Sequence, residues 1–285
     1  MKLSITDIKQ KKNKSEKITV VTAYDYSTAK ICDTSGIEII LVGDSAGMVM
    51  LGYDNTLSVT MDEMLVFCKG VINGSKNALI VADMPFGSYH SHSSFAILNA
   101  VKFIKLGCSA IKIEGGREIA PIVHFLTQKG IPVMGHIGLK PQTSPLWTGY
   151  KVQGKTCDSA IELLNDAIEL EKSGAFSIVL EMVTAEIAEK ISQLLSIPTI
   201  GIGSGSKCDG QVLVLHDLLG LYTNIKPKFV KRYVDSYSLF SAAINNYVTD
   251  VKSGEFPNSE YAFSMPPEEI QKFENYFNSL KNEKK

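Results

Sequence analysis

The sequence of 285 residues has little of what membrane and secreted proteins need. No apolar run approaches the roughly 20 residues that a membrane-spanning helix requires. The lysine-rich start, residues 1–17, is not followed by the apolar run of a signal peptide. The five cysteines are odd in number, widely spaced and without a CxxC pattern, which favours reduced thiols and argues against a cysteine zinc site. We therefore expect a cytoplasmic protein without membrane contact.

The sequence also has almost no net charge. Lysine and arginine number 29 and aspartate and glutamate 30, mixed along the chain, so the formal net charge is -1. Such a balance provides no field that would concentrate DNA, RNA or an anionic membrane. The composition therefore argues against nucleic acid as a partner. With 45% apolar residues, the chain has ample material for a large core.

What the sequence does contain is a regular alternation of short apolar runs and segments of helical period, from Ile18 to about Gly220. Such alternation is typical of an α/β protein with a parallel sheet and helices outside it. Eight runs fit a closed (β/α)8 TIM barrel, a fold of about 250 residues, and a doubly wound open sheet is the alternative. We expect a single barrel domain over residues 1–265 and a C-terminal helix or tail over 266–285. The predicted strands are 18–23, 37–42, 78–82, 110–113, 132–135, 176–180, 198–202 and 211–215.

Helix boundaries are also marked in the sequence. Thr60 and Glu63 have the spacing of a capping box, which predicts the start of a helix. Asp158 is predicted to begin the helix that runs to Lys172. Four glycines stand where helices should end before the next strand, namely Gly36, Gly107, Gly130 and Gly174.

Three of the apolar runs end in an acid, at Asp44, Asp83 and Glu114. A barrel of this kind builds its site at the carboxyl ends of the strands, and these acids follow consecutive strands, so we expect them side by side. Neighbouring carboxylates repel one another unless a cation compensates them, and oxygen ligands without cysteine or paired histidine favour Mg²⁺. One such acid alone could be a helix cap or a surface residue. The whole set predicts a magnesium site in which some acids bind through water.

Other strand ends carry groups suited to acid-base chemistry. Lys112 lies two residues before Glu114, and the period of two sends both side chains to the same face, which indicates an anionic substrate beside the metal. Glu181 ends the sixth predicted strand, across the barrel from the acids, where it can take a proton from carbon. His136 ends the fifth run and could orient the substrate or be structural.

A series of short blocks along the chain matches one known family. The blocks are TAYD at 22–25, LVGDS at 41–45, LGYD at 51–54, ADMPFGSY at 82–89, KIEGG at 112–116, GHIGL at 135–139, VQG at 152–154, GIG at 201–203, CDGQVLV at 208–214, PKFVKRY at 227–233 and SGEFP at 253–257. In order and spacing they resemble ketopantoate hydroxymethyltransferase, over about residues 3–264. The segment 144–149 departs most from the family pattern.

The resemblance implies an enzyme that transfers a hydroxymethyl group from 5,10-methylenetetrahydrofolate to 3-methyl-2-oxobutanoate. The product is 2-dehydropantoate (ketopantoate), for pantothenate and coenzyme A synthesis, and one Mg²⁺ per subunit would stabilise the enolate of the oxo acid. The family is typically a homodecamer, which implies a homo-oligomer here. The motifs map the metal ligands onto Asp44, Asp83 and Glu114, the substrate contacts onto Asp44, Ser45, Asp83, Lys112 and His136, and the base onto Glu181.

Two alternatives stay open at this point. Another Mg²⁺-dependent 2-oxo-acid enzyme on the same barrel, a carbon-carbon lyase or a phosphoenolpyruvate-mutase-like protein, would share the acids. A catalytically silent relative would keep the fold and lose a metal acid. Because all of the acids are present, the sequence favours an active enzyme.

Overall fold

The computed structural model describes residues 2–143, 150–224 and 227–283. The segment 144–149, which departs most from the family pattern, lies outside the described residues. The chain divides into two compact units, Met1–Val234 and Asp235–Lys285. The sequence predicts the end of the barrel domain later, at residue 265, and that boundary remains a prediction.

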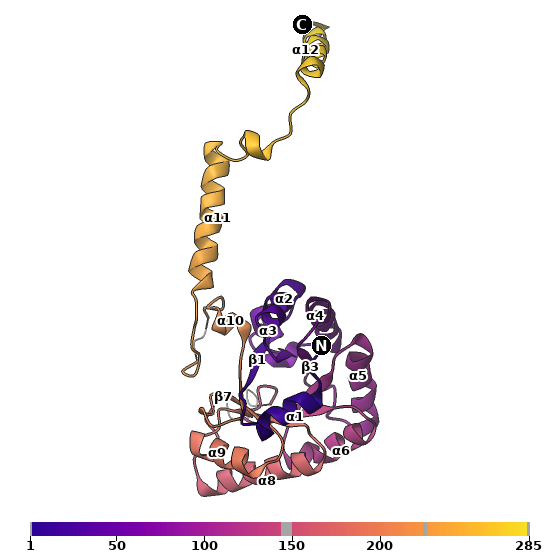
Figure 1. The fold of residues 1–285 in the computed structure, drawn as a ribbon. Helices are drawn as coiled ribbons and strands as arrows, with labels where there is room; N and C mark the ends of the chain where they lie inside the picture. Colours follow the sequence, from indigo (N-terminus) through magenta and orange to yellow (C-terminus); the bar gives the residue numbers. More distant parts are fainter. Residues whose placement is uncertain (1, 144–149, 225–226, 284–285) are drawn as a thin grey trace. The chain divides into compact units, whose positions relative to one another are not determined.

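The first unit is built on eight parallel strands that close into a barrel in the order of the chain. Figure 1 shows the ribbon of this unit in colours from indigo to orange. The last strand pairs with the first, in a register that sets Ile18 opposite Gly210 and Val21 opposite Leu213. The predicted (β/α)8 barrel is therefore confirmed, and the open doubly wound sheet is wrong. The strands are β1 Ile18–Thr22, β2 Ile39–Val42, β3 Leu79–Asp83, β4 Ala110–Glu114, β5 Val133–Gly138, β6 Ser177–Glu181, β7 Thr199–Ile202 and β8 Gly210–Leu213.

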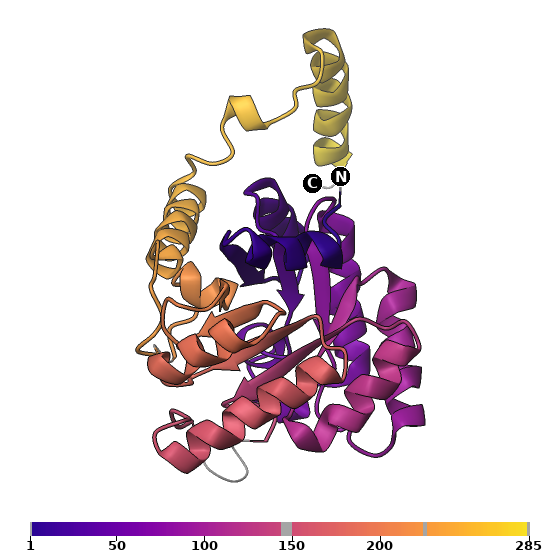
Figure 2. The ribbon, with the colours of Figure 1, turned by 60° about the horizontal axis from the view of Figure 1, so that its bottom comes forward.

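Helices surround the barrel on its outer face, as Figure 2 shows. Most of them connect one strand to the next, so each crossover returns the chain to the same end of the barrel and the strands run parallel. Two 3-10 turns, Thr56–Ser58 and Arg117–Ile119, precede helices. The helices of this unit are α1 Ile5–Asn13, α2 Tyr26–Thr34, α3 Ala46–Val49, α4 Met61–Gly74, α5 Ser93–Leu106, α6 Ala120–Gln128, α8 Cys157–Lys172, α9 Ala185–Leu194 and α10 Leu215–Leu218.

The predicted helix signals are confirmed with one exception. Thr60 and Glu63 form the expected capping box at the start of α4. The start of α8 differs, because the side chain of Thr156 accepts the hydrogen bond from Ser159 N and Asp158 lies inside the first turn. The glycines predicted to end helices all have positive φ angles, which glycine adopts at little cost: 83° at Gly36, 118° at Gly107, 79° at Gly130 and 97° at Gly174.

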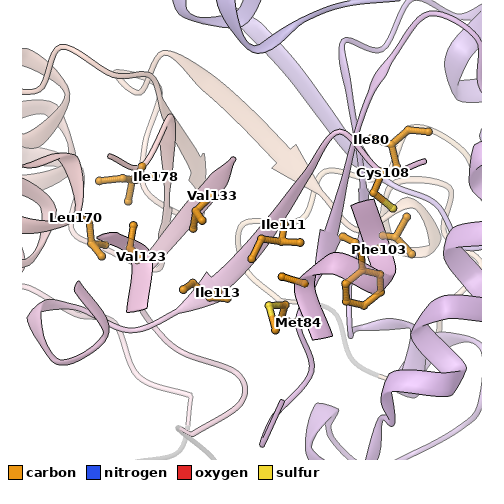
Figure 3. Close-up of a cluster of buried hydrophobic side chains, with 14 of the residues drawn as sticks. Ile80, Met84, Phe103, Cys108, Ile111, Ile113, Val123, Val133, Leu170 and Ile178 are labelled. Carbon is orange, nitrogen blue, oxygen red and sulfur yellow. The ribbon is translucent and has the colours of Figure 1, made fainter. Parts of the chain in front are cut away.

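In several strands, successive apolar residues alternate between two apolar clusters. Ile39 and Leu41 of β2 belong to the cluster that fills the barrel interior. Ile40 of the same strand belongs to the cluster between the strands and the helices. Figure 3 shows part of this outer cluster, where Ile111 of β4 and Phe103 of α5 are labelled. Because side chains of a strand alternate in direction, this pattern also fixes which later residues of a strand point into the barrel.

Helix α1 packs at the end of the barrel where the strands begin. Ile8 of this helix is fully buried, and it shares the interior cluster with the first residues of three strands, Ile18, Ile39 and Leu79. The interior is therefore filled with apolar side chains at the amino ends of the strands. Polar groups that point inward can gather only at the carboxyl ends.

Asp33 ties the end of α2 to the start of β3. Its carboxylate is buried and accepts hydrogen bonds from Ser75 Oγ, Ala78 N and both the backbone N and Nδ2 of Asn77, all at 2.8 to 2.9 Å. Burial acts to raise the pKa of Asp33, but these hydrogen bonds outweigh it and lower the pKa to about 2. The ionised carboxylate therefore stabilises the folded barrel.

We expect Asp33→Asn to lower the free energy of unfolding by about 2 to 4 kcal/mol at pH 7. The new side-chain NH₂ group would face the N–H and O–H donors that bond to the carboxylate in the original protein, and some of these donors would lose their acceptor. The native pKa is depressed, so the stabilisation is fully present above the unfolded value near 4 and is lost as the pH falls toward 2. Urea unfolding of both proteins at several pH values measures this, with the exposed Asp62→Asn as the control. Equal stability at pH 7 would contradict the assignment.

The second unit, taken by itself, contains two helices. They are α11 Ser236–Ser253 and α12 Pro267–Glu283, with a 3-10 turn, Ser259–Tyr261, between them. Helix α12 falls in the segment for which the sequence predicts a C-terminal helix. In the part of the chain that the structure describes, no helix has both the length and the apolar character needed to cross a membrane.

Candidate active site

The direction of the strand side chains brings five ionisable groups to the carboxyl end of the barrel interior. Asp83, Lys112, Glu114, His136 and Glu181 each lie two or four residues beyond an interior apolar residue of their own strand. The pairing register sets Asp83 beside Lys112 and Glu114 beside His136. Glu181 is partly exposed and the other four are buried. These predicted residues therefore meet at one end of the barrel.

Asp44 and Ser45 join this group from the loop that follows β2. The backbone N of Asp44 donates a hydrogen bond to Asp83 Oδ2 at 3.1 Å. A Cβ atom added at Gly43 would lie 2.8 Å from Ser45 Oγ and 3.4 Å from Asp83 Oδ2, so glycine is what lets these polar groups approach. Ser45 Oγ also lies 2.8 Å from the hydroxyl of Tyr24, a contact that the sequence did not predict.

Lys112 lies at the centre of the site. Its Nζ is 3.1 Å from Asp83 Oδ1, 3.7 Å from Glu114 Oε1 and 3.1 Å from His136 Nδ1. Burial acts to lower the pKa of Lys112, but the surrounding carboxylates outweigh it and raise that pKa. Lys112 is therefore a permanent cation that contacts groups from two neighbouring strands.

One lysine does not neutralise the acids around it. Burial and the neighbouring carboxylates raise the pKa of Asp44 well above its ordinary value. Burial also raises the pKa of Asp83, although Lys112 opposes that effect. The two aspartates therefore stand in a region where further positive charge would be stabilising.

Glu114 is held as an ionised carboxylate. Burial acts to raise its pKa, but His136 and Lys112 outweigh burial and lower the pKa to about 2. Its Oε2 accepts a hydrogen bond from Gln142 N at 3.1 Å, and its Oε1 faces Lys112 and His136. Both oxygens of Glu114 therefore have partners within the protein.

His136 connects Glu114 to Glu181. Its Nδ1 lies 3.5 Å from Glu114 Oε1, and its Nε2 lies 3.3 Å from Glu181 Oε2 without the alignment of a hydrogen bond. Burial and Lys112 act to lower the pKa of His136, but the two carboxylates raise it to about 9. Whether the ring is charged or accepts a hydrogen bond from Lys112, the Nε2 proton faces Glu181. Glu181 is thus joined to the acids through one ring rather than separated from them across the barrel.

The sequence did not identify two further buried residues at this site, Tyr89 and Gln142. Both are almost fully buried and lie in the loops that follow β3 and β5. Their side chains are hydrogen-bonded to each other and to the acids or their backbone. A polar residue in the loop after a barrel strand is the only sequence signal that could have pointed to Gln142.

The residues present fit a hard divalent cation. Among residues 2–143, 150–224 and 227–283, no three His, Cys, Asp or Glu side chains already form a complete set of metal ligands. Mg²⁺ needs only one or two protein carboxylates, because it keeps several waters. Asp83 Oδ1 is a buried carboxylate oxygen that faces the Lys112 ammonium at 3.1 Å, so it already lies where a cation is stabilised. The pair of Asp44 and Asp83 therefore fits Mg²⁺.

Comparison with known sequences gives one consistent family. The family model of ketopantoate hydroxymethyltransferase matches residues 2–259. A 3-methyl-2-oxobutanoate hydroxymethyltransferase of Nitrosopumilus maritimus is 54% identical over 272 residues, which are 95% of this chain and 98% of the relative. An enzyme of the same name from Heliobacterium modesticaldum is 53% identical over 268 residues, 94% of this chain and 97% of the relative.

Comparison with solved structures agrees on the fold. Phosphoenolpyruvate phosphomutase from Streptomyces platensis subsp. rosaceus superposes with a TM-score of 0.61 at 14% identity, covering 99% of both chains. Phosphonopyruvate hydrolase in complex with oxalate and Mg²⁺ gives a TM-score of 0.59 at 11% identity, covering 98% of this chain and 99% of the other. At this level of identity the likeness shows the fold alone.

Proposed function

The chain belongs to the ketopantoate hydroxymethyltransferase family, an enzyme family of one-carbon transfer, and from this membership we propose the full reaction. A hydroxymethyl group passes from 5,10-methylenetetrahydrofolate to 3-methyl-2-oxobutanoate, giving 2-dehydropantoate. The observation that carries the proposal is that relatives about half identical along nearly the whole chain bear this name, while the acids and the cation that the chemistry needs lie together at one barrel end.

Asp44 and Asp83 would hold Mg²⁺, with Glu114 acting through water. When bound, the ion would polarise the oxo group of the substrate and so make its C3 proton more acidic. The raised pKa of both aspartates supports this assignment, because it indicates that their negative charge is not fully compensated. One ion per subunit follows from one such pair in each barrel.

Lys112 and Ser45 would bind the oxo acid. Lys112 is a fixed positive charge and would attract the substrate carboxylate, while Ser45 Oγ is held by Tyr24 and can donate or accept a hydrogen bond. Glu181 is the partly exposed carboxylate at the edge of the group, so it can reach a substrate carbon and take its C3 proton. His136, whose Nε2 lies 3.3 Å from Glu181 Oε2, would keep the Glu181 side chain in place.

The product constrains how the hydroxyl arrives. C3 of the substrate carries one proton, so C3 becomes quaternary once the one-carbon unit is attached. A folate adduct at that carbon could not release folate by losing a C3 proton. Water must therefore supply the hydroxyl, either by releasing formaldehyde in the site or by displacing folate from the adduct.

We expect the protein to exchange the C3 proton of 3-methyl-2-oxobutanoate for deuterium in D₂O with Mg²⁺ and without folate. EDTA should abolish the exchange, and added Mg²⁺ should restore it. NMR of the C3 proton measures the rate, and methylenetetrahydrofolate added afterwards tests formation of 2-dehydropantoate. If the protein with Mg²⁺ gives no exchange above the buffer rate, the proposed proton abstraction is wrong.

The product feeds pantothenate and coenzyme A synthesis, as the family name implies. The assembly is a homo-oligomer, a homodecamer by family resemblance. The location is the cytoplasm, which agrees with the five free cysteines.

A further inference from the structure

Gln142 touches two of the acids at once. Its Nε2 donates hydrogen bonds to Asp44 Oδ2 at 2.8 Å and to Met84 O at 2.9 Å, and its backbone N donates to Glu114 Oε2 at 3.1 Å. Only 1% of the residue is exposed. One residue of the loop after β5 thus contacts carboxylates that come from β4 and from the loop after β2.

Tyr89 contacts the other end of the Gln142 amide, at Oε1. Its hydroxyl lies 2.8 Å from Gln142 Oε1 and 3.0 Å from Glu114 O, and it accepts a hydrogen bond from Glu114 N at 3.0 Å. If the amide were turned over, Oε1 would face Asp44 Oδ2 and Met84 O, which only accept hydrogen bonds. These two acceptors therefore keep the Nε2 donors directed at Asp44, and the Tyr89 hydroxyl contacts the amide from the Oε1 side.

This arrangement orients carboxylates without neutralising them. Buried carboxylates repel one another, and a lysine or arginine in place of Gln142 would hold them by cancelling their charge. The neutral Gln142 holds the two carboxylates through hydrogen bonds, while the Tyr89 phenol is bonded to Gln142 and to the backbone of Glu114, so the negative charge is left for another cation. Outer residues of this type, hydrogen-bonded to metal-binding carboxylates, are worth about 10- to 100-fold in metal affinity.

We propose that Gln142 and Tyr89 form a clamp that orients Asp44 and Glu114 for divalent metal binding, an inference that rests on the proposed Mg²⁺ site. Neither residue takes part in proton transfer. Both are positioning residues, and Tyr89 acts on Asp44 through Gln142.

The test measures Mn²⁺ binding to the full chain by the loss of the free-ion EPR signal, without substrates. We expect Gln142→Met to bind Mn²⁺ about 10- to 100-fold more weakly, because methionine fills the volume without donors. Tyr89→Phe should weaken binding less, and its effect should shrink in the Gln142→Met background. The exposed Gln193→Met is the matched control and should bind as the original protein does. At saturating Mg²⁺, the kcat of each clamp variant should return toward the original value, which a general loss of structure would not allow.

The outcomes separate this inference from the proposed function. If the original protein binds no Mn²⁺, the metal site itself is wrong and the clamp with it. If the original protein binds and Gln142→Met binds equally well, only the clamp is wrong. Tyr89→Phe, which loses a single hydroxyl, decides the question if circular dichroism shows that Gln142→Met does not fold. If the losses of Mn²⁺ affinity caused by the two substitutions simply add in the double variant, Tyr89 does not act through Gln142.

Discussion

Glu181→Gln is expected to slow C3 proton exchange of 3-methyl-2-oxobutanoate by about 10²- to 10⁴-fold, the usual contribution of a positioned general base. The amide keeps the size of the side chain and removes the proton acceptor. Glu181 is not part of the Asp44 and Asp83 pair, so Mg²⁺ binding should change little. The side chain is 15% exposed, so the neutral amide should cost little stability.

The exchange is followed by NMR in D₂O at saturating Mg²⁺, with metal binding and thermal unfolding measured on the same sample. Glu186→Gln removes an exposed carboxylate of α9 and is the matched control, for which we expect unchanged exchange. Exchange by Glu181→Gln at the original rate would mean that another group takes the proton. Loss of metal binding by this variant would mean that Glu181 is a metal ligand and not only the general base.

Asp83→Asn is expected to weaken Mg²⁺ binding by about 100-fold or more, because even outer partners of metal ligands contribute 10- to 100-fold. The amide removes one negative charge from a pair that attracts the cation. It also sets an uncharged group 3.1 Å from the Lys112 ammonium. Lys112 keeps Glu114 and His136 as neighbours, so we expect the barrel to remain folded.

Calorimetric titration with Mg²⁺ measures this loss, and exchange at several Mg²⁺ concentrations shows how far excess metal restores activity. Asp62→Asn, an exposed substitution on α4, should leave the affinity unchanged. If Asp83→Asn binds Mg²⁺ as tightly as the original protein does, the metal lies elsewhere. Asp44→Asn would then show whether the other member of the pair carries the affinity alone.

The barrel could be predicted from the sequence because its strands are short apolar runs with a regular spacing. This pattern of apolar runs misplaced two strand ends, one of them because a polar residue is buried inside the strand. The pattern ended the fifth strand at Gly135, whereas β5 continues to Gly138, since His136 lies inside the barrel among charged partners. The same pattern put the eighth strand at 211–215, but Leu215 already begins α10.

The charged part of the site could be predicted for a related reason. Asp83, Lys112 and Glu114 occupy strand ends, and strand geometry alone brings such residues together. Tyr89 and Gln142 belong to loops whose paths depend on many contacts at once. Their hydrogen bonds to the acids span 25 to 98 residues of sequence, and no local spacing predicts contacts of that kind.

The barrel carries its own counter-ion, Lys112, in the middle of the acidic group. Lys112 compensates part of the charge of Asp83 and Glu114 without a metal, so we expect the protein to stay folded when Mg²⁺ is removed. In a cell short of magnesium, the protein should lose its catalytic activity while it remains folded and resistant to proteases. When the ion returns, activity should recover at the speed of metal binding, without new synthesis of the protein.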